Sequence, residues 1–366
     1  MNSDTASPAP RRGFSVRPEG IFSGPAAARA IERGDALALA GGPLAFGFCE
    51  LAIGDARILL PVDEAKSWAT KTGHSEDMTA ALARLTGPRP AFAGLALDRP
   101  RLMGVINVTP DSFSDGGDFA EAETAIEQGL ALREAGADIL DIGGESTRPR
   151  AEPVAVEEEL RRTIPVVHAL SLAGAIVSID TRRAAVMTAA IAAGARIVND
   201  VTALTGDPAS LDAVAASNVS LVLMHMQGDP RQMQENPTYA DAPVEIRDFF
   251  VDRLAACVSA GIVPGRIAVD PGIGFGKNDR HNIEVLQNLA LFHELGVALL
   301  LGVSRKSFIS RLSRKEAPKQ RLPGSLAAGL AGFDRGVQML RVHDVAETRQ
   351  ALAIWQALAG GVSSRA

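Results

Sequence analysis

The sequence is poor in cysteine, in aromatic residues and in positive charge. Among 366 residues there are two cysteines, 4% are aromatic and the net charge is −6. Cys49 and Cys257 lie far apart and in no spacing that suits a metal site, so reduced thiols in a cytoplasmic protein are expected. A nucleic-acid surface needs clustered Lys and Arg with stacking rings, and this composition therefore predicts no nucleic-acid partner.

Long hydrophobic runs are also missing. No stretch approaches the roughly eighteen apolar residues that span a bilayer, so no membrane partner is expected. Arg11 and Arg12 have no apolar segment behind them, which argues against a signal peptide. We expect residues 1–20, rich in Ser, Pro and Ala, to form a disordered tail. The rest contains enough hydrophobic residues, 46% of the whole, for a sizeable core in a soluble protein.

Residues 21–97 predict a small α/β extension that precedes the main domain. Strand-like runs alternate here with helical patterns, and no catalytic constellation is visible, so its role is unknown. The predicted helices are residues 25–33, 63–69 and 76–85, and the predicted strands are residues 44–53 and 56–62. The segment ends in GPRPAFAG, whose Pro and Gly content is typical of a linker.

Residues 98–366 predict a closed barrel. Eight short apolar segments, often β-branched, each precede a longer segment of helical periodicity. Strict alternation of this kind indicates parallel strands with helical crossovers, and eight units in about 250 residues is the size of a (β/α)8 TIM barrel. An open doubly wound sheet is the alternative, but no G-x-G-x-x-G follows the first strand.

Each predicted strand ends in polar or ionisable residues. Barrel enzymes keep their chemistry at this end of the strands. Any one such residue could cap a helix or close a turn, but several interrupt apolar strands, where an unpartnered polar group is costly. The residues, strand by strand, are Asn107; Glu145, Ser146, Thr147 and Arg148; Asp180 and Thr181; Asn199 and Asp200; Met224, His225 and Gln227; Asp270; Ser304, Arg305 and Lys306; and Arg341, His343 and Asp344.

Two groups among these residues indicate different chemistry. The first provides carboxylate acceptors, an amide and an ammonium, which fit the rim of a planar, nitrogen-rich heterocycle: Asp180, Asn199, Asp270 and Lys306. The second provides guanidiniums and a histidine, which suit phosphate or pyrophosphate: Asn107, Arg148, Arg341 and His343. Alternatively, the arginines of the second group pair with Glu145 or Asp111 at the surface.

Two further motifs have a plainer interpretation. Gly272–Lys277 looks like a phosphate loop, but Asn278 stands where the Walker motif needs Ser or Thr. Its glycines are better explained if they let the backbone approach a ligand closely, with Phe275 forming one side of the ligand site. His225 fits a buried core histidine and a ligand contact equally well.

Eight segments together resemble dihydropteroate synthase. They run in the right order from about residue 101 to the C-terminus, and the first two are the most specific: MGVINVTPDSFSDGG at 103–117, DIGGESTRP at 141–149, SIDT at 178–181, VND at 198–200, HMQG at 225–228, DPGIGFGK at 270–277, SRKSF at 304–308 and RVHDV at 341–345.

The resemblance implies a transferase of folate biosynthesis on a TIM barrel. Such an enzyme joins 6-hydroxymethyl-7,8-dihydropterin diphosphate to 4-aminobenzoate, releasing pyrophosphate, usually with Mg²⁺ and as a homodimer, and sulfonamides compete for the aminobenzoate pocket. The resemblance implies a pterin site made of Asp180, Asn199, Asp270, Lys306 and Met224. It implies a diphosphate site made of Asn107, Arg148, Arg341 and His343, with Asn107 near the Mg²⁺. It also implies an aminobenzoate pocket shaped by Thr147, Phe275 and Ser304, with Ser146 also binding substrate.

The sequence departs from the family pattern at two places. Arg150 stands where the family commonly has Gly, and the leader before Asp98 has no counterpart in the pattern. A methyltetrahydrofolate-dependent methyltransferase would share the Asp and Asn contacts but would not need the first loop or a diphosphate site. A non-catalytic pterin-binding relative would be expected to lack Asn107, the residues of the first loop or Arg341, and all are present; Arg150 and the leader leave this alternative open.

Overall fold

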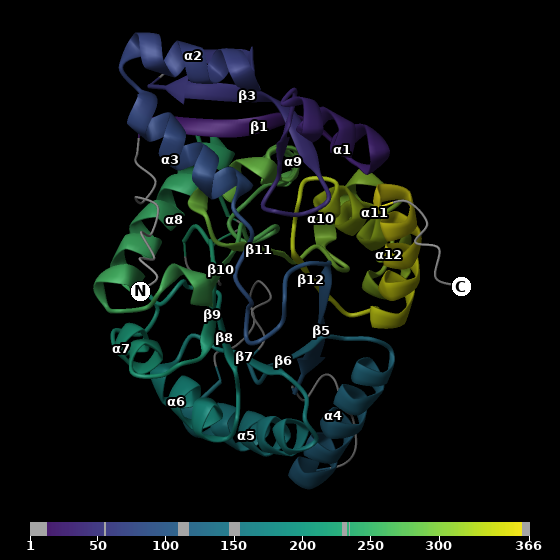
Figure 1. Ribbon diagram of the computed structural model, residues 1–366. Coiled ribbons are helices and arrows are strands. Elements are labelled where there is room, and N and C mark those ends of the chain that lie inside the picture. Colours follow the sequence, from purple (N-terminus) through teal and green to yellow (C-terminus); the bar gives the residue numbers. More distant parts are fainter. Residues whose placement is uncertain are drawn as a thin grey trace.

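Eight parallel strands close into a barrel in the computed structural model, which describes residues 13–54, 56–108, 117–145, 154–228, 233 and 235–360 (Figure 1). The strands follow one another around the ring in sequence order, and β12 pairs with β5 to close it. The predicted TIM barrel is therefore confirmed. The strands are β5 (Arg101–Asn107), β6 (Ile139–Gly143), β7 (Val177–Asp180), β8 (Ile197–Asp200), β9 (Ser220–Met224), β10 (Ile267–Asp270), β11 (Ala298–Leu301) and β12 (Met339–Val342).

Helices surround this ring, and their capping shows why some of them begin where they do. The side chain of Asp241 accepts from the Val244 N–H at 3.2 Å, and Asn278 forms a capping box with His281. The helices are α4 (Gly117–Glu134), α5 (Val156–Leu172), α6 (Ala184–Ala192), α7 (Ser210–Ala215), α8 (Ala242–Ser259), α9 (Asp279–Gln287), α10 (Ser307–Leu312), α11 (Leu322–Phe333) and α12 (Val345–Gly360), with 3-10 turns η2 (Pro264–Arg266), η3 (Leu289–Leu295) and η4 (Pro318–Arg321).

One predicted helix is divided in two. The pattern over residues 281–294 predicts a continuous helix, but α9 ends at Gln287 and the chain continues as the tighter η3. All seven residues of η3 are buried, so tertiary packing against the N-terminal residues outweighs the local periodicity.

The floor of the barrel is formed by a segment that was predicted to be a linker. Phe92 is 1% exposed and packs against inward-facing residues such as Met103 and Ile139. Ala93 N–H donates to the Ser220 hydroxyl at 2.9 Å, which ties the segment to β9. The Pro and Gly residues around Phe92 therefore shape a plug, and the linker prediction is wrong here.

The N-terminal residues form an α/β unit, as predicted, but its sheet has four strands where two were predicted and begins earlier than expected. β1 pairs with β3 from Phe14 opposite Ile53 to Phe22 opposite Ala45. Residues 14–20 thus belong to the sheet and not to a disordered tail; residues 1–12 lie outside the described part of the chain. The elements are β1 (Phe14–Phe22), α1 (Gly24–Arg33), β2 (Leu37–Ala38), β3 (Ala45–Ile53), β4 (Ala56–Pro61), α2 (Val62–Thr72) and α3 (Ser75–Thr86).

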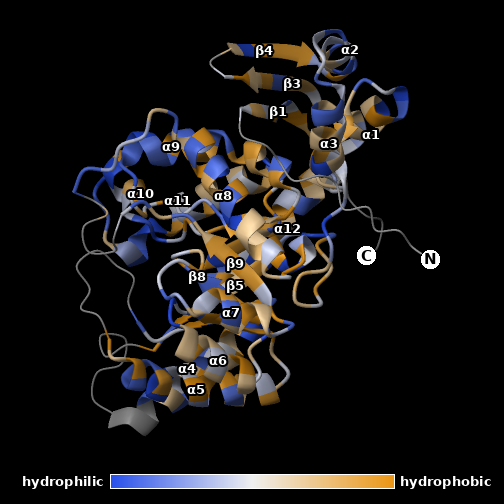
Figure 2. Cartoon of the chain, turned by 90° about the vertical axis from the view of Figure 1, so that its left-hand side faces the viewer, coloured by the Kyte–Doolittle hydropathy of each residue, from blue (hydrophilic) through white to orange (hydrophobic). Residues whose placement is uncertain are grey.

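This N-terminal unit (residues 14–86) packs against the barrel at η3 and α12, and Arg247 of α8 donates to its Phe14 carbonyl (Figure 2). Its own core is separate and includes Val16, Leu51 and Leu85. In Figure 2 the strands β5 and β9, coloured largely as hydrophobic, lie in the interior of the barrel domain, away from the unit. Within the ranges that the structure describes, no helix is long and apolar enough to cross a membrane.

Candidate active site

The polar residues at the strand ends converge on one mouth of the barrel. Asp180, the last residue of β7, is in register with Asn199 on β8, and Asp270, the last residue of β10, is in register with Met224 on β9. Parallel strands bring their carboxyl ends to the same face, and side chains in register point the same way. Asp180, Asn199 and Asp270 therefore lie at the same mouth, and Lys306 lies near both aspartates, whose charges act on its pKa.

Arg341 crosses this mouth and joins the two predicted groups. Its Nε donates to Asp141 Oδ2 at 2.6 Å, and its Nη2 donates to Asp180 Oδ2 at 2.8 Å. β12 and β7 are not neighbours in the ring, so the guanidinium spans the opening. Arg341 of the predicted phosphate group is thus bonded to Asp180 of the predicted heterocycle group, so the two groups share one mouth.

Burial and mutual charge shift the ionisation of these groups. Burial raises the pKa of Asp180 to about 7, against the opposing effect of Arg341, and the negative charge of Asp141 adds to the rise. Burial lowers the pKa of Arg341, but the carboxylates of Asp141 and Asp180 outweigh this and leave it above its ordinary value. Arg341 therefore stays charged while Asp180 titrates near neutral pH.

Lys306 and Asp270 form the opposite side of the mouth. Burial lowers the pKa of Lys306 to about 8, although Asp270 acts in the other direction. Burial likewise raises the pKa of Asp270, whose Oδ1 accepts from the Gly272 N–H at 2.8 Å. The Lys306 ammonium lies 4.0 Å from the centre of the Phe275 ring, a cation–π contact that places Phe275 beside the predicted pterin site.

Glycines keep the space between these side chains free. A Cβ at Gly302 would lie 3.4 Å from Asp270 Oδ2 and 4.0 Å from Arg341 Cβ. A Cβ at Gly143 would lie 3.7 Å from Asp180 Oδ2. A flat ring can therefore approach the carboxylates without a side chain from either strand in its way.

The glycine-rich loop at 272–277 is explained mainly by contacts within the protein. A Cβ at Gly272 would lie 2.0 Å from the His225 carbonyl oxygen, and one at Gly276 would lie 2.4 Å from that of Gln227. Both have positive φ. The prediction that these glycines serve a ligand is thus wrong for Gly272 and Gly276, whereas a Cβ at Gly274 would lie 3.9 Å from Lys306 Nζ.

The buried side chain of Lys277 holds this loop together by bonding to its backbone carbonyl oxygens. It is fully buried, and its Nζ lies 3.0 Å from the carbonyl oxygens of both Gly272 and Phe275 and 3.0 Å from His225 Nδ1. Burial lowers the pKa of His225 to about 2. His225 is 6% exposed and packs edge-on against Phe249. Of the two predicted alternatives, a buried core histidine and a ligand contact, the structure therefore favours the core histidine.

Ser304 and His343 contact each other at the edge of the mouth. Ser304 Oγ accepts from the His343 N–H at 3.2 Å and lies 3.1 Å from its Nδ1. Burial lowers the pKa of His343 to about 3, and Arg341 acts in the same direction, so the imidazole is neutral at pH 7. His343 therefore offers phosphate a neutral N–H and no positive charge.

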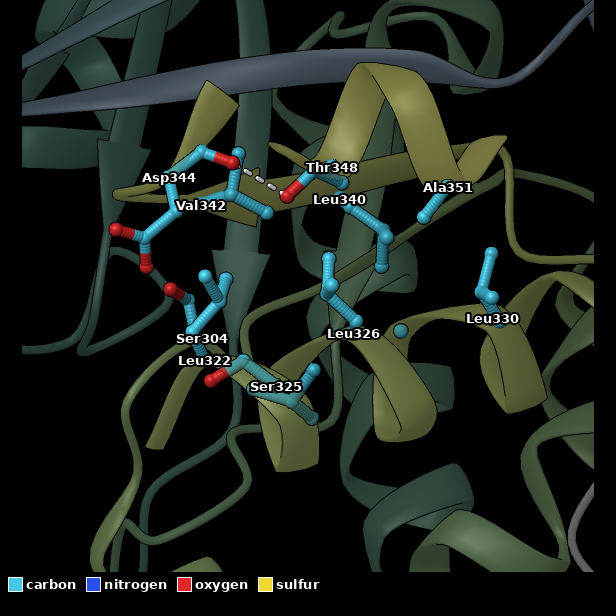
Figure 3. Close-up of a pocket in the computed structure, with 12 residues that line it drawn as sticks. Ser304, Leu322, Ser325, Leu326, Leu330, Leu340, Val342, Asp344, Thr348 and Ala351 are labelled. Atoms are coloured by element: carbon cyan, nitrogen blue, oxygen red, sulfur yellow. Dashed lines mark hydrogen bonds between the residues drawn. The ribbon is translucent and has the colours of Figure 1, made fainter. Parts of the chain in front are cut away.

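A small cavity beside Ser304 is not the substrate pocket. It lies between β12, α11 and α12 and is lined by Ser304, Ser325 and Asp344, with Thr348 bonded to the Asp344 carbonyl at 2.6 Å (Figure 3). Its volume of about 10 Å³ has room for roughly one water molecule.

Several predicted residues lie outside the described part of the chain: Ser146, Thr147, Arg148, Asp111 and Arg150. Glu145, a possible partner of Arg148, is bonded to Arg182 and Arg183, each at 3.2 Å. Asn107 ends β5, in register with Gly143. Among the described residues there is no group of three or more His, Cys, Asp or Glu side chains that could hold a metal.

Sequence reasoning missed Asp141. It is 0% exposed, and it contacts both Arg341 and Asn199. Its sequence signal is an acidic residue within the apolar run ILDIGG, two residues before the end of β6.

Comparison with known proteins decides the family. A family model described as "Pterin binding enzyme" matches residues 103–343. Dihydropteroate synthase of Escherichia coli K12 is 44% identical over 264 residues, which are 72% of this chain and 93% of the relative. That of Neisseria meningitidis serogroup B is 46% identical over 269 residues, 72% of this chain and 94% of the relative. The chain belongs to the dihydropteroate synthase family of pterin binding enzymes.

Solved structures of dihydropteroate synthases support the same assignment. The Xanthomonas albilineans enzyme with 4-aminobenzoic acid is 50% identical, with a TM-score of 0.70 over 75% of this chain and 99% of that one. The Yersinia pestis enzyme with a sulfonamide drug is 44% identical, with a TM-score of 0.69 over 72% of this chain and 96% of that one. The family model begins at residue 103, so the N-terminal unit lies outside it.

Proposed function

We propose that the chain condenses 6-hydroxymethyl-7,8-dihydropterin diphosphate with 4-aminobenzoate to give 7,8-dihydropteroate and pyrophosphate. The observation that carries this function is the gathering of Asp180, Asn199, Asp270 and Lys306 around a mouth that Arg341 crosses. A Xanthomonas albilineans dihydropteroate synthase, 48% identical to this chain, has been solved with 7,8-dihydropteroate.

The arrangement of charges suits the bond that must break. Cleavage of the bond between the pterin methylene carbon and the diphosphate oxygen develops positive charge on the pterin and negative charge on the leaving group. The carboxylates of Asp180 and Asp270 stabilise the first, and the guanidinium of Arg341 stabilises the second. Preorganised charged groups stabilise developing charge most strongly in a site that excludes water.

The incoming amine needs little activation. An aniline nitrogen is nucleophilic while neutral; its lone pair forms the new bond to the methylene carbon, and it then loses one proton. The neutral imidazole of His343 fits a site that does not depend on a strong base. The aminobenzoate pocket, proposed to be shaped by Ser146, Thr147, Phe275 and Ser304, is supported at Phe275 by its contact with Lys306.

We propose Mg²⁺ as the cofactor, with Asn107 as its protein ligand. A single amide oxygen fits this ion, because Mg²⁺ commonly keeps several waters and binds through substrate phosphates with few protein ligands. The amide lies at the end of β5 in the same inward-facing row of the barrel as Asp180. The ion would neutralise negative charge on the leaving diphosphate.

We also propose that the protein works in the cytoplasm as a homodimer. Cys49 and Cys257 are both buried free thiols, in keeping with a reducing compartment. Light scattering of the purified chain tests the dimer, and cell fractionation tests the location.

A pyrophosphate-release assay separates this function from its rivals. With the pterin diphosphate and 4-aminobenzoate, equimolar pyrophosphate and 7,8-dihydropteroate are expected. A methyltransferase would release no pyrophosphate and would instead demethylate methyltetrahydrofolate. A non-catalytic relative would bind pterin in calorimetry without turnover. Either result would reject the proposed function.

A further inference from the structure

Asp141 lies beneath the mouth, where no substrate reaches it. It sits on β6 in register with Val105 and Ser178, one inward-facing step below Gly143 and Asp180. Its side chain is 0% exposed, whereas that of Asp180 is 12% exposed. A ligand in the mouth can therefore contact Asp180 but not Asp141.

One oxygen of Asp141 holds two substrate-binding residues at once. Oδ2 accepts from Arg341 Nε at 2.6 Å and from Asn199 Nδ2 at 3.1 Å. Asn199 is 5% exposed, so this bond fixes the orientation of its amide. Because Nδ2 is directed to Asp141, Oδ1 is the amide atom left to accept from a ligand.

Arg341 donates one hydrogen bond to Asp141 and one to Asp180, and a ligand can replace only the bond to Asp180. The Asp141 carboxylate is out of reach of water, and leaving it without its counter-ion would strand a buried charge. The Asp180 carboxylate faces the mouth, where a heterocycle with N–H donors can take the place of Arg341 Nη2. Arg341 can thus release Asp180 while it keeps Asp141.

We propose that Asp141 is a positioning residue that acts as a pivot for Arg341. Binding of the pterin ring to Asp180 frees Nη2 of Arg341 for the diphosphate, while Asp141 holds Nε and keeps the guanidinium at the mouth. Occupation of the heterocycle site thereby prepares the phosphate site. This inference rests on the proposed function for its ligands, but its test does not require turnover.

The test measures the coupling between two ligands by calorimetry in the presence of Mg²⁺. The dissociation constant of pyrophosphate is determined with and without saturating 6-hydroxymethylpterin. In the wild type, the pterin should tighten pyrophosphate binding by roughly tenfold, within the 5- to 150-fold common for coupled sites. No tightening in the wild type would overturn the pivot.

Asp141→Asn should abolish this coupling. The amide keeps an acceptor for Asn199 but loses the charge that holds Arg341, which then depends on Asp180 alone. Ser178→Ala is the matched control, because Ser178 is also 0% exposed and is in register with Asp141, and it should leave the coupling unchanged. Unchanged coupling in Asp141→Asn would also overturn the pivot.

Two further readouts distinguish a pivot from a merely structural role. The charge of Asp141 raises the pKa of Asp180, so Asp141→Asn should move the acid limb of kcat/KM to lower pH, and Ser178→Ala should not. If Asp141→Asn does not fold, Arg341→Lys tests the same geometry, because one ammonium cannot span both carboxylates. Coupling that survives in Arg341→Lys would overturn the pivot. A wild-type chain that binds pterin and shows the coupling, but does not form 7,8-dihydropteroate, would reject only the proposed function.

Discussion

Arg84 of the N-terminal unit and Glu294 of the barrel meet in the interior of the protein. Arg84 Nε donates to the Glu294 carbonyl oxygen at 2.6 Å, and its Nη2 lies 3.8 Å from the carboxylate, which is 0% exposed. Arg247 of α8 lies 3.3 Å from the other carboxylate oxygen and also donates to the Phe14 carbonyl. The N-terminal unit is thus joined to the barrel through buried charge and is not a loosely tethered appendage.

Arg84→Met should destabilise the whole protein. It leaves the buried Glu294 carboxylate with Arg247 alone, and removal of one member of a buried ion pair costs about 3–5 kcal/mol. We expect a loss of about 3 kcal/mol in urea unfolding, since Arg247 remains. Arg33→Met is the control: Arg33 also pairs with an aspartate, but at the surface, and no measurable change is expected. A loss for Arg84→Met no larger than that for Arg33→Met would show that the buried pair does not stabilise the junction between the unit and the barrel.

Phe92→Ala should open a cavity under the barrel. Phe92 is 1% exposed, and truncation of a buried phenylalanine typically costs about 3–5 kcal/mol. Val263→Ala, at a residue that is 57% exposed, serves as the control in the same denaturation experiment. A deletion that tests the role of the N-terminal unit should therefore end before residue 88, because removal of Phe92 would unfold the barrel for an unrelated reason. An unchanged unfolding midpoint for Phe92→Ala would contradict the assignment of the floor.

The sequence predicts the barrel and most of the mouth because both depend on local periodicity. Alternation of apolar strands and helices gives the topology, and Asp180, Asn199 and Asp270 stand at or beside the ends of their strands. Their proximity follows from parallel geometry alone. The contact of Arg341 with Asp180 does not follow, because β12 and β7 are separated in the ring and only a three-dimensional placement brings the guanidinium across.

The predictions that the structure contradicts, for residues 14–20, Phe92 and Gly272, failed because long-range packing outweighs the local sequence pattern. Pro18 and Gly20 give β1 the local character of a turn, yet pairing with β3 makes it a strand at the edge of its sheet, where proline is tolerated. Phe92 lies among Pro and Gly residues and is buried only because a barrel floor is present. Gly272 looks like a ligand-binding glycine, although the neighbouring His225 carbonyl requires it.

Lys277→Met should damage the loop that carries Phe275. The ammonium contacts the carbonyl oxygens of Gly272 and Phe275, and each buried acceptor left unpaired costs about 1–3 kcal/mol. We expect at least about 2 kcal/mol of lost stability and a raised KM for 4-aminobenzoate, because the loop borders its proposed pocket. Lys319→Met, at an exposed lysine, is the control. A normal KM in a destabilised variant would mean that Lys277 supports the fold without shaping the pocket.

The pH dependence of kcat/KM should be bell-shaped because two groups at the mouth titrate near neutrality. Burial raises the pKa of Asp180 to about 7, so its ionised, substrate-accepting form grows as the pH rises through that value. Burial lowers the pKa of Lys306 to about 8, so its charged form declines as the pH rises further. Since kcat/KM reports the free enzyme, its maximum should fall between these two values.

Two substitutions assign the limbs of this profile. Lys306→Arg keeps the positive charge on a group that does not titrate below about pH 12, so the alkaline limb should move out of the measurable range while the acid limb remains. Asp180→Asn should remove the acid limb at a lower overall rate, because the neutral amide cannot stabilise positive charge on the pterin. An alkaline limb that persists unchanged in Lys306→Arg would assign that limb to another group, such as Lys277, whose pKa burial also lowers to about 7.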